Sequence, residues 1–185
     1  DSPISGSSVV GLGKYASELL TNSFFAGSDV RYTNLRLASV NELKTEETMV
    51  RPLNVFVDCM LQGKPIHVVG GMQVMSYIDP RDVATAILAL LSPDCSAWQP
   101  VYNIGTGWMC TEPLLEMARR VVSIGCRQFQ LPAVAIDIEE KQVRMTAGLD
   151  IQRIQQDTHW SPCITLDSMI TALYQMKLSQ MEQGK

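Results

Sequence analysis

Strand-like segments alternate with helical segments along most of this chain, and this alternation constrains the fold more than any other feature. The segments that are rich in strand-forming residues are 30–37, 66–69, 74–78, 101–104 and 133–138. Those in which apolar residues recur at helical spacing are 8–25, 50–61, 83–91, 111–124 and 167–181. Such an alternation is typical of α/β proteins, so we predict that fold class. The polar segment 38–47 is predicted to be a loop.

Glycine, aspartate and proline mark the ends of these elements. Gly63 follows a predicted helix, and glycine favours the position just past a helix C-terminus. Asp82 and Asp150 each stand immediately before a predicted helix, where a carboxylate can accept N–H groups of the first turn. Both are therefore predicted helix caps. Pro113 is predicted to lie in the first turn of the helix over 111–124.

Composition and charge argue against several classes of function. The chain has 185 residues, 46% of them hydrophobic, which suffices for the core of about one domain. A net charge of −4 without a basic stripe argues against nucleic acid or an anionic membrane as a partner. The five cysteines are odd in number and widely spaced, which indicates neither a disulfide framework nor a metal site and favours a reducing cytoplasm. No apolar run is long enough for a membrane span.

The chain shows no start of a nucleotide-binding βαβ unit. Gly105 and Gly107 form a Gly-x-Gly pair without the third glycine of the dinucleotide-binding motif. Gly11 and Gly13 precede a lysine in a helical segment, so they do not form a P-loop. Because the chain begins at Asp1 and not at Met, we expect it to derive from a longer product.

Several segments nevertheless follow known patterns, in order. Residues 3–18 (PISGSSVVGLGKYASE) align without a gap to P-I-x-P-x-S-x-Y-G-x-S-K-x-x-x-E, and residues 101–107 match V-Y-N-I-G-T-G. Between and after them, similar patterns are L-R-x-f-N-v-Y-G at 35–42, G-x-P-I-x-V-x-G at 63–70, Q-x-R-D-F-I-x-x-x-D-V-A-x-A-I at 73–87 and a D…L-G-W-x-P ending at 150–162. Together they resemble the extended short-chain dehydrogenase/reductase family, the NAD-dependent nucleotide-sugar epimerases and dehydratases.

The resemblance implies the C-terminal part of a doubly wound Rossmann-type fold with a small substrate-binding α/β subdomain. Residues 1–47 would supply the catalytic helix and a late Rossmann strand. Residues 48–185 would form mainly the substrate-binding subdomain, with returning Rossmann elements. The glycine-rich pyrophosphate turn would lie upstream, so this chain alone is not expected to bind NAD well.

The resemblance places the catalytic residues on the first helix, and one of them is replaced. In the family, a tyrosine exchanges a proton with the sugar hydroxyl while NAD accepts a hydride. That position is Val10, which has no ionisable group. Lys14 matches the family lysine that lowers the tyrosine pKa and holds the nicotinamide ribose, so it is the predicted catalytic and cofactor-binding residue. Alternatively, Lys14 forms an exposed ion pair with Glu18 one turn later.

Five residues are predicted to contact the substrate: Ser39, Asn54, His67, Met75 and Arg144. Ser39 replaces the asparagine of the L-R-x-f-N motif, and Met75 replaces an arginine that commonly grips the substrate diphosphate. Arg144 lies where the family often has a second phosphate-binding arginine. The alternatives are a strand-end serine for Ser39, a half-buried strand histidine for His67, packing for Met75 and an exposed charge for Arg144.

These observations leave more than one function open. The first is part of an NAD-dependent nucleotide-sugar epimerase- or dehydratase-like protein, competent neither for catalysis nor for NAD binding as this chain alone. The second is a catalytically inactive relative that binds a nucleotide or a partner, which the departures at Val10, Gly13 and Met75 favour. The third is proton transfer by a group elsewhere. We expect a nucleotide sugar or related small molecule as ligand and a homodimer through the first helix, although burial within the monomer also explains that helix's apolar residues.

Overall fold

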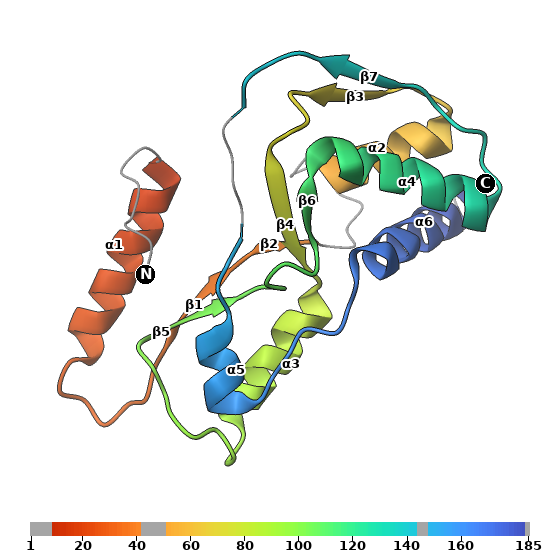
Figure 1. The fold of residues 1–185 in the computed structure, drawn as a ribbon. Coiled ribbons are helices and arrows are strands. Elements are labelled where there is room, and N and C mark those ends of the chain that lie inside the picture. Colours follow the sequence, from red (N-terminus) through yellow and green to blue (C-terminus); the bar gives the residue numbers. More distant parts are fainter. Residues whose placement is uncertain (1–8, 42–50, 144–147, 184–185) are drawn as a thin grey trace.

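The computed structural model describes residues 9–41, 51–143 and 148–183 (Figure 1). Its helices are α1 (Val9–Phe25), α2 (Pro52–Gln62), α3 (Pro80–Leu91), α4 (Leu114–Phe129), α5 (Gln152–Thr158) and α6 (Leu166–Gln183). Its strands are β1 (Asn34–Leu37), β2 (Ser39–Val40), β3 (Ile66–Val69), β4 (Val74–Ile78), β5 (Val101–Ile104), β6 (Thr111–Pro113) and β7 (Ile136–Glu139).

Most strand pairs are parallel. β1 pairs with β5, β2 with β4, and β3 with β7, all in parallel, whereas β4 and β6 are antiparallel. Parallel neighbours need long crossover connections, and α2, α3 and α4 lie within those connections. The predicted α/β fold with parallel pairing is therefore confirmed.

Two groups of buried residues hold the described elements together. The larger joins α2, α4 and α6 to β3 and β4, with Leu53, Met117 and Tyr174 among its fully buried members. The smaller joins β1 and β5 to α3 and α5, and is centred on Tyr102 and Ile104. β4 contributes to both, because Tyr77 belongs to the larger group and the next residue, Ile78, to the smaller. Alternation along one strand thus links the two cores.

Helix α1 stands apart from both cores (Figure 1). It has no buried residue, and large apolar side chains such as Leu20 and Phe24 are mostly exposed. At its C-terminal end, the ring of Phe25 stacks on Tyr32. Burial within the monomer, one of the two expected explanations of these apolar residues, is therefore not observed in the described structure.

The start of α3 differs from the prediction. Asp79, not Asp82, caps the helix and accepts the N–H of Arg81 at 2.9 Å. Asp82 lies in the first turn, 1% exposed, and accepts the backbone N–H groups of Cys163 at 3.1 Å and Ile164 at 3.0 Å. Its carboxylate therefore ties the chain before α6 to α3, a contact that local sequence does not reveal.

Other element boundaries differ where tertiary pairing decides. Thr111 does not open a helix, because the segment from it to Pro113 is strand β6, paired with β4. Pro113 is accordingly the residue before α4 and not part of its first turn. The predicted loop after β1 contains the short strand β2, paired with β4. Asp150 accepts the N–H of Gln152, the first residue of α5, at 2.9 Å, although Ile151 and not Asp150 occupies the N-cap position.

Three helix ends adopt the left-handed backbone conformation, among them Gln130, which ends α4 with φ of 55°. Gly63 ends α2 with φ of 64°, as its type predicts. His159 ends α5 with φ of 58°. It occupies the glycine position of the L-G-W-x-P pattern, so the backbone geometry accounts for glycine in that pattern.

A methyl group added at Gly125 is expected to destabilise the fold. Its Cβ would lie 2.6 Å from both Met60 Cε and Tyr174 Oη in the larger core. We expect Gly125→Ala to lower the free energy of unfolding by about 1–3 kcal/mol in urea denaturation. Gly13→Ala is the matched control, because its Cβ meets nothing within 4 Å. That change is expected to stabilise α1 by up to about 1 kcal/mol. Equal effects of the two substitutions would contradict this packing.

Candidate functional site

Unpaired buried polar groups gather where β2 and β4 meet the start of α2. Tyr77 and Asn41 are each 1% exposed, yet the Tyr77 hydroxyl and both polar atoms of the Asn41 amide have no hydrogen-bond partner among the residues that the structure describes. The buried Oδ1 of Asn54, in the first turn of α2, is also unpaired. Such groups are rare in folded proteins because each costs about 1–3 kcal/mol. They are the strongest indication of a ligand site in the described structure.

Backbone pairing brings these side chains together. Ser39 lies opposite Tyr77 in the parallel pair of β2 and β4, and the N–H of Asn41 donates to the carbonyl of Ile78 at 2.8 Å. Since alternate residues of a strand share a face, Ser39, Asn41 and Tyr77 lie on one side of this pair. That is the side of the larger core, to which Tyr77 and α2 both belong.

The environment of Tyr77 mixes burial with positive charge. Burial raises the pKa of its hydroxyl to about 12, while the Arg51 charge and the nearby N–H of Leu53 act in the opposite direction. The Leu53 N–H lies close but does not meet hydrogen-bond geometry with the hydroxyl, which stays unpaired. Tyr77 is thus a neutral donor directed at the start of α2.

The start of α2 suits an anion. Arg51 occupies the N-cap position without a side-chain cap, and Pro52 follows it. The first N–H groups of a helix carry partial positive charge and bind anions readily. Together with the Tyr77 hydroxyl and the Asn41 amide, this helix end offers several donors to one negatively charged group.

Lys14 lines a hollow between α1 and β1. The cavity measures about 580 Å³ and is lined by Gly11, Lys14, Tyr15, Ser17, Glu18, Thr21 and residues 34–37. Val10 lies one turn before Lys14 on α1 and is 73% exposed. The position that the resemblance aligns with the family tyrosine therefore faces solvent in the described structure.

The carboxylate of Glu18 pairs with Arg36 of β1 and not with Lys14. Arg36 donates from Nε at 2.8 Å and from Nη2 at 2.7 Å to the two oxygens. The alternative prediction, an ion pair between Lys14 and Glu18, is therefore wrong. A bidentate pair with a guanidinium group has better geometry than an ion pair with a lysine one turn away. Lys14 is left facing the cavity.

This pair makes stability depend on pH. The hydrogen bond from Arg36 lowers the pKa of Glu18 below its ordinary 4.5. A depressed carboxyl pKa contributes stability above the unfolded value, and this contribution is lost as pH falls through the folded value. We expect the free energy of unfolding to decline below about pH 4.5, and Glu18→Gln to flatten that decline. Urea denaturation between pH 3 and 6 measures both, and identical slopes would contradict the pairing.

The other predicted substrate residues are scattered. Met75 packs against the larger core. His67 is not half-buried, because its side chain is 61% exposed on β3 and its Nε2 lies 3.2 Å from Glu139 Oε2. β3 and β7 lie at the top of the view in Figure 1, apart from α1 at its left. Ser39 and Asn54 are the two that lie with the unpaired polar groups, and Arg144 is outside the described residues.

Sequence reasoning missed Tyr77 and Asn41, although a signal was present. Tyr77 adds a hydroxyl where the pattern Q-x-R-D-F-I has phenylalanine, and Asn41 places an amide where L-R-x-f-N-v-Y-G has tyrosine. Both substitutions put polar atoms into a position that the fold buries.

One edge of β1 is open. Asn34 donates its N–H to the carbonyl of Pro100, just before β5, and Ala38 donates to Ile104 of β5, so the N–H groups of Leu35 and Leu37 are directed the other way. Within the described residues, no strand pairs there. This edge borders the cavity beneath α1, whose apolar side chains are exposed. An unpaired edge beside an apolar helix is a surface that a further strand can cover.

Comparison with known proteins decides the lineage. The profile of the NAD dependent epimerase/dehydratase family matches residues 1–105 of the 185. The chain belongs to this family. No curated protein matches the sequence.

Several solved structures share the fold of this epimerase/dehydratase chain. UDP-glucose 4-epimerase from Thermotoga maritima, solved with UDP-glucose, is 22% identical over 92% of this chain and 53% of its own, with a TM-score of 0.74. dTDP-glucose 4,6-dehydratase from Bacillus anthracis, solved with NAD, is 15% identical over 98% and 56%, with a TM-score of 0.79. UDP-glucuronic acid 4-epimerase from Bacillus cereus, solved with UDP-glucuronic acid and NAD, is 18% identical over 98% and 58%, with a TM-score of 0.74.

The epimerase/dehydratase chain spans little more than half the length of these proteins. Within the described ranges, no cluster of His, Cys, Asp and Glu side chains could hold a metal ion. None of the described helices combines the length and apolarity needed to cross a bilayer.

Proposed function

We propose that this chain binds a nucleotide sugar at the start of α2, as the substrate-binding part of an NAD-dependent nucleotide-sugar epimerase- or dehydratase-like protein. The observation that carries the proposal is the set of unpaired buried groups of Tyr77, Asn41 and Asn54. Relatives of the same fold were solved with UDP-glucose and UDP-glucuronic acid, which supports this class of ligand.

The unpaired groups suit such a ligand energetically. A ligand oxygen that accepts from the Tyr77 hydroxyl or the Asn41 amide replaces no internal hydrogen bond, so its binding removes an existing cost. The diphosphate of a nucleotide sugar is anionic, and the first N–H groups of α2 favour negative charge. The sugar and base would then be held by neutral polar groups such as Asn54 and Ser39.

The redox part of the reaction needs more than this chain. Bound NAD supplies the hydride acceptor in this family, and Lys14 is the one described residue that matches the family's cofactor contacts. No glycine-rich turn for the pyrophosphate is present, so the residues at hand do not fit NAD by themselves. We infer that an NAD-binding α/β unit adds a strand to the open edge of β1 and packs against α1.

A second function is favoured by a specific observation. Val10 cannot transfer a proton, and Met75 packs against the larger core where the resembled pattern has a phosphate-binding arginine. Both fit an inactive relative that keeps ligand or partner binding. The exposed apolar side of α1 also fits a homodimer. Sedimentation of the chain with and without its NAD-binding unit tells whether that unit or a second copy of the chain covers α1.

Two tyrosine variants test the proposed site. Tyr77→Phe removes an unpaired hydroxyl, so the free protein should keep or gain stability, while its affinity for UDP-glucose or UDP-glucuronic acid falls about ten-fold. Tyr174→Phe is the matched control, because its buried hydroxyl donates to the Val121 carbonyl at 3.0 Å. It should lose stability and keep affinity.

Calorimetric titration and urea denaturation give both readouts. Binding of neither nucleotide sugar, or an affinity unchanged by Tyr77→Phe, would contradict the proposed site.

A further inference from the structure

Strand β7 has an open edge that the proposed function does not use. It pairs in parallel with β3, and no strand of the described residues lies on its other side. β3 contacts α2 and α4, whereas β7 contacts mainly β3 and lies outermost at the top of Figure 1. Every residue of β7 after Ile136 is exposed. The strand therefore presents its free edge to solvent.

The pairing with β3 determines which backbone groups of β7 are free. The N–H of Gly70 donates to the carbonyl of Glu139 at 2.9 Å, so the backbone of Glu139 is directed to β3. Parallel strands bond through alternate residues, so the backbone of Asp137 is directed to β3 as well. The N–H and C=O groups of Ile136 and Ile138 then lie at the open edge, where a further strand can pair with them.

The side chains of β7 alternate between apolar and acidic. Ile136 and Ile138 lie on one face of the strand, and Asp137 and Glu139 lie on the other. Ile136 packs against the larger core, whereas Ile138 is 49% exposed. A strand added at this edge would meet two carboxylates on one face and an exposed apolar side chain on the other.

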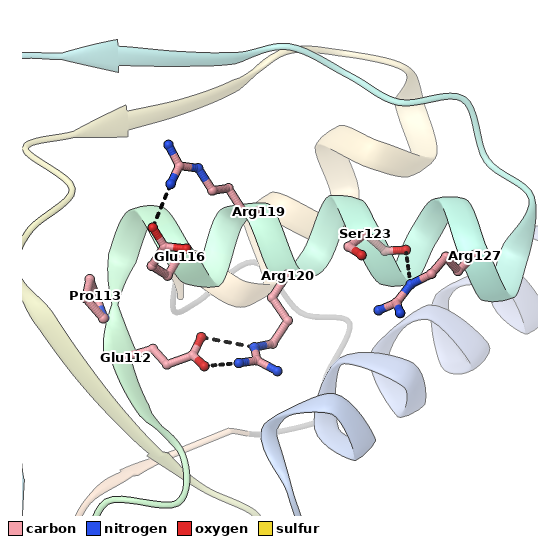
Figure 2. A pocket seen from close by; sticks show the side chains of 7 residues that line it. All are labelled: Glu112, Pro113, Glu116, Arg119, Arg120, Ser123 and Arg127. Carbon is pink, nitrogen blue, oxygen red and sulfur yellow. Dashed lines mark hydrogen bonds and ion pairs between the residues drawn. The ribbon is translucent and has the colours of Figure 1, made fainter.

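The edge carries negative charge. Residues 137–141 hold three carboxylates and one lysine. Nε2 of His67 lies 3.2 Å from Glu139 Oε2, but both side chains are more than half exposed, so this contact contributes little and can be exchanged. Arg119 of α4 pairs with Glu116 of its own helix at 2.7 Å (Figure 2). The carboxylates of β7 are therefore available to a positively charged partner.

Charge also decides between the possible occupants. If β7 paired with β7 of a second copy, the carboxylates of Asp137 and Glu139 would face carboxylates of the same kind, which is destabilising. Lys or Arg side chains at alternate positions of an added strand would face them favourably. We propose that β7 binds an extended basic segment of another protein, in which Lys or Arg alternates with apolar residues. Backbone pairing supplies affinity, and the carboxylates supply specificity.

Titration of the full chain with the peptide acetyl-Lys-Val-Lys-Val-Lys-Val-amide tests the proposal. Binding should saturate and should slow the exchange of the Ile136 and Ile138 amide hydrogens with solvent. The acidic peptide acetyl-Glu-Val-Glu-Val-Glu-Val-amide should bind at least about ten-fold more weakly. So should acetyl-Lys-Lys-Lys-Val-Val-Val-amide, which has the same charge without the alternation. Slowed exchange at Leu35 and Leu37 instead would place the peptide on the open edge of β1 and overturn the proposal.

Variants of the chain separate charge from backbone pairing. Asp137→Lys with Glu139→Lys should reverse the preference, so that the acidic peptide binds at least about ten-fold more tightly than the basic one. Asp29→Lys with Glu182→Lys is the matched control, because it makes the same change of charge at exposed positions outside β7. It should keep the preference for the basic peptide. Ile138→Pro removes an N–H from the open edge and none that bonds to β3, so it should weaken binding about ten-fold.

The thermal transition of each variant shows whether it is folded, and the exchange of charges decides if Ile138→Pro is not. An unchanged preference in Asp137→Lys with Glu139→Lys, or an equal reversal in the control, would overturn the proposal. So would a dimer of the free chain in sedimentation that the exchange of charges on β7 alters, because a second copy would then occupy the edge.

Discussion

Val10→Tyr is expected to raise NAD-linked turnover of a nucleotide sugar about 100-fold or more in a polypeptide that joins this chain to its NAD-binding unit. The substitution supplies the proton-transferring group one turn before Lys14, on the same helix face. Position 10 is 73% exposed, so a tyrosine can enter without displacing core residues. Formation of NADH at 340 nm, or exchange of label at the sugar carbon, measures the turnover.

Val9→Tyr provides the matched control for this gain. It places the same side chain on the neighbouring exposed position, which is off the face of Lys14. It should leave turnover at the level of the parent. Equal turnover in Val10→Tyr and Val9→Tyr would favour the inactive relative, because replacement of the tyrosine would then not be the limiting defect.

Asp82→Ala is expected to cause the largest loss of stability, about 3 kcal/mol or more. The carboxylate is 1% exposed and accepts from the N–H groups of Cys163 and Ile164 and from Cys163 Sγ at 3.3 Å. Its removal leaves two backbone N–H groups without a partner, and hydrogen bonds to a charged group contribute about 1.5–3 kcal/mol each. The midpoint of urea denaturation measures the loss.

Two milder variants separate the contributions at this site. Asp82→Asn keeps one acceptor oxygen and should lose less than the alanine variant. Cys163→Ala removes only the thiol contact at the exposed Cys163, so its effect should stay within about 0.5 kcal/mol. A loss below about 1 kcal/mol in Asp82→Ala would show that this carboxylate does not hold the chain before α6 to α3.

Local sequence patterns predict those helices and strands whose secondary structure is determined by the spacing of their apolar residues. The helix over 8–25 and the strands over 66–69 and 74–78 agree with α1, β3 and β4, because spacing of apolar residues and flanking glycines fix them. The sequence predicts that Thr111 lies in a helix, because the residues that follow it have helical periodicity. Pairing of β6 with β4 overrides that preference, and no local signal reports a distant strand.

The candidate site was only partly predictable for the same reason. Ser39 and Asn54 are predicted from the sequence, but Tyr77 and Asn41 are not. Whether a buried polar group lacks a hydrogen-bond partner can be seen only in the folded structure. Similarly, Glu18 has a lysine one turn away in sequence, yet Arg36 reaches it across the cavity from β1. Long-range contacts of this kind need the folded structure.

Titration of the chain alone with NAD and with UDP-glucose tests the central claim most directly. We place substrate binding at the start of α2 and NAD binding on a further unit that covers β1 and α1. We therefore expect saturable binding of UDP-glucose and no saturable binding of NAD, with or without the nucleotide sugar. Saturable NAD binding by the chain alone, together with no binding of UDP-glucose, would contradict it.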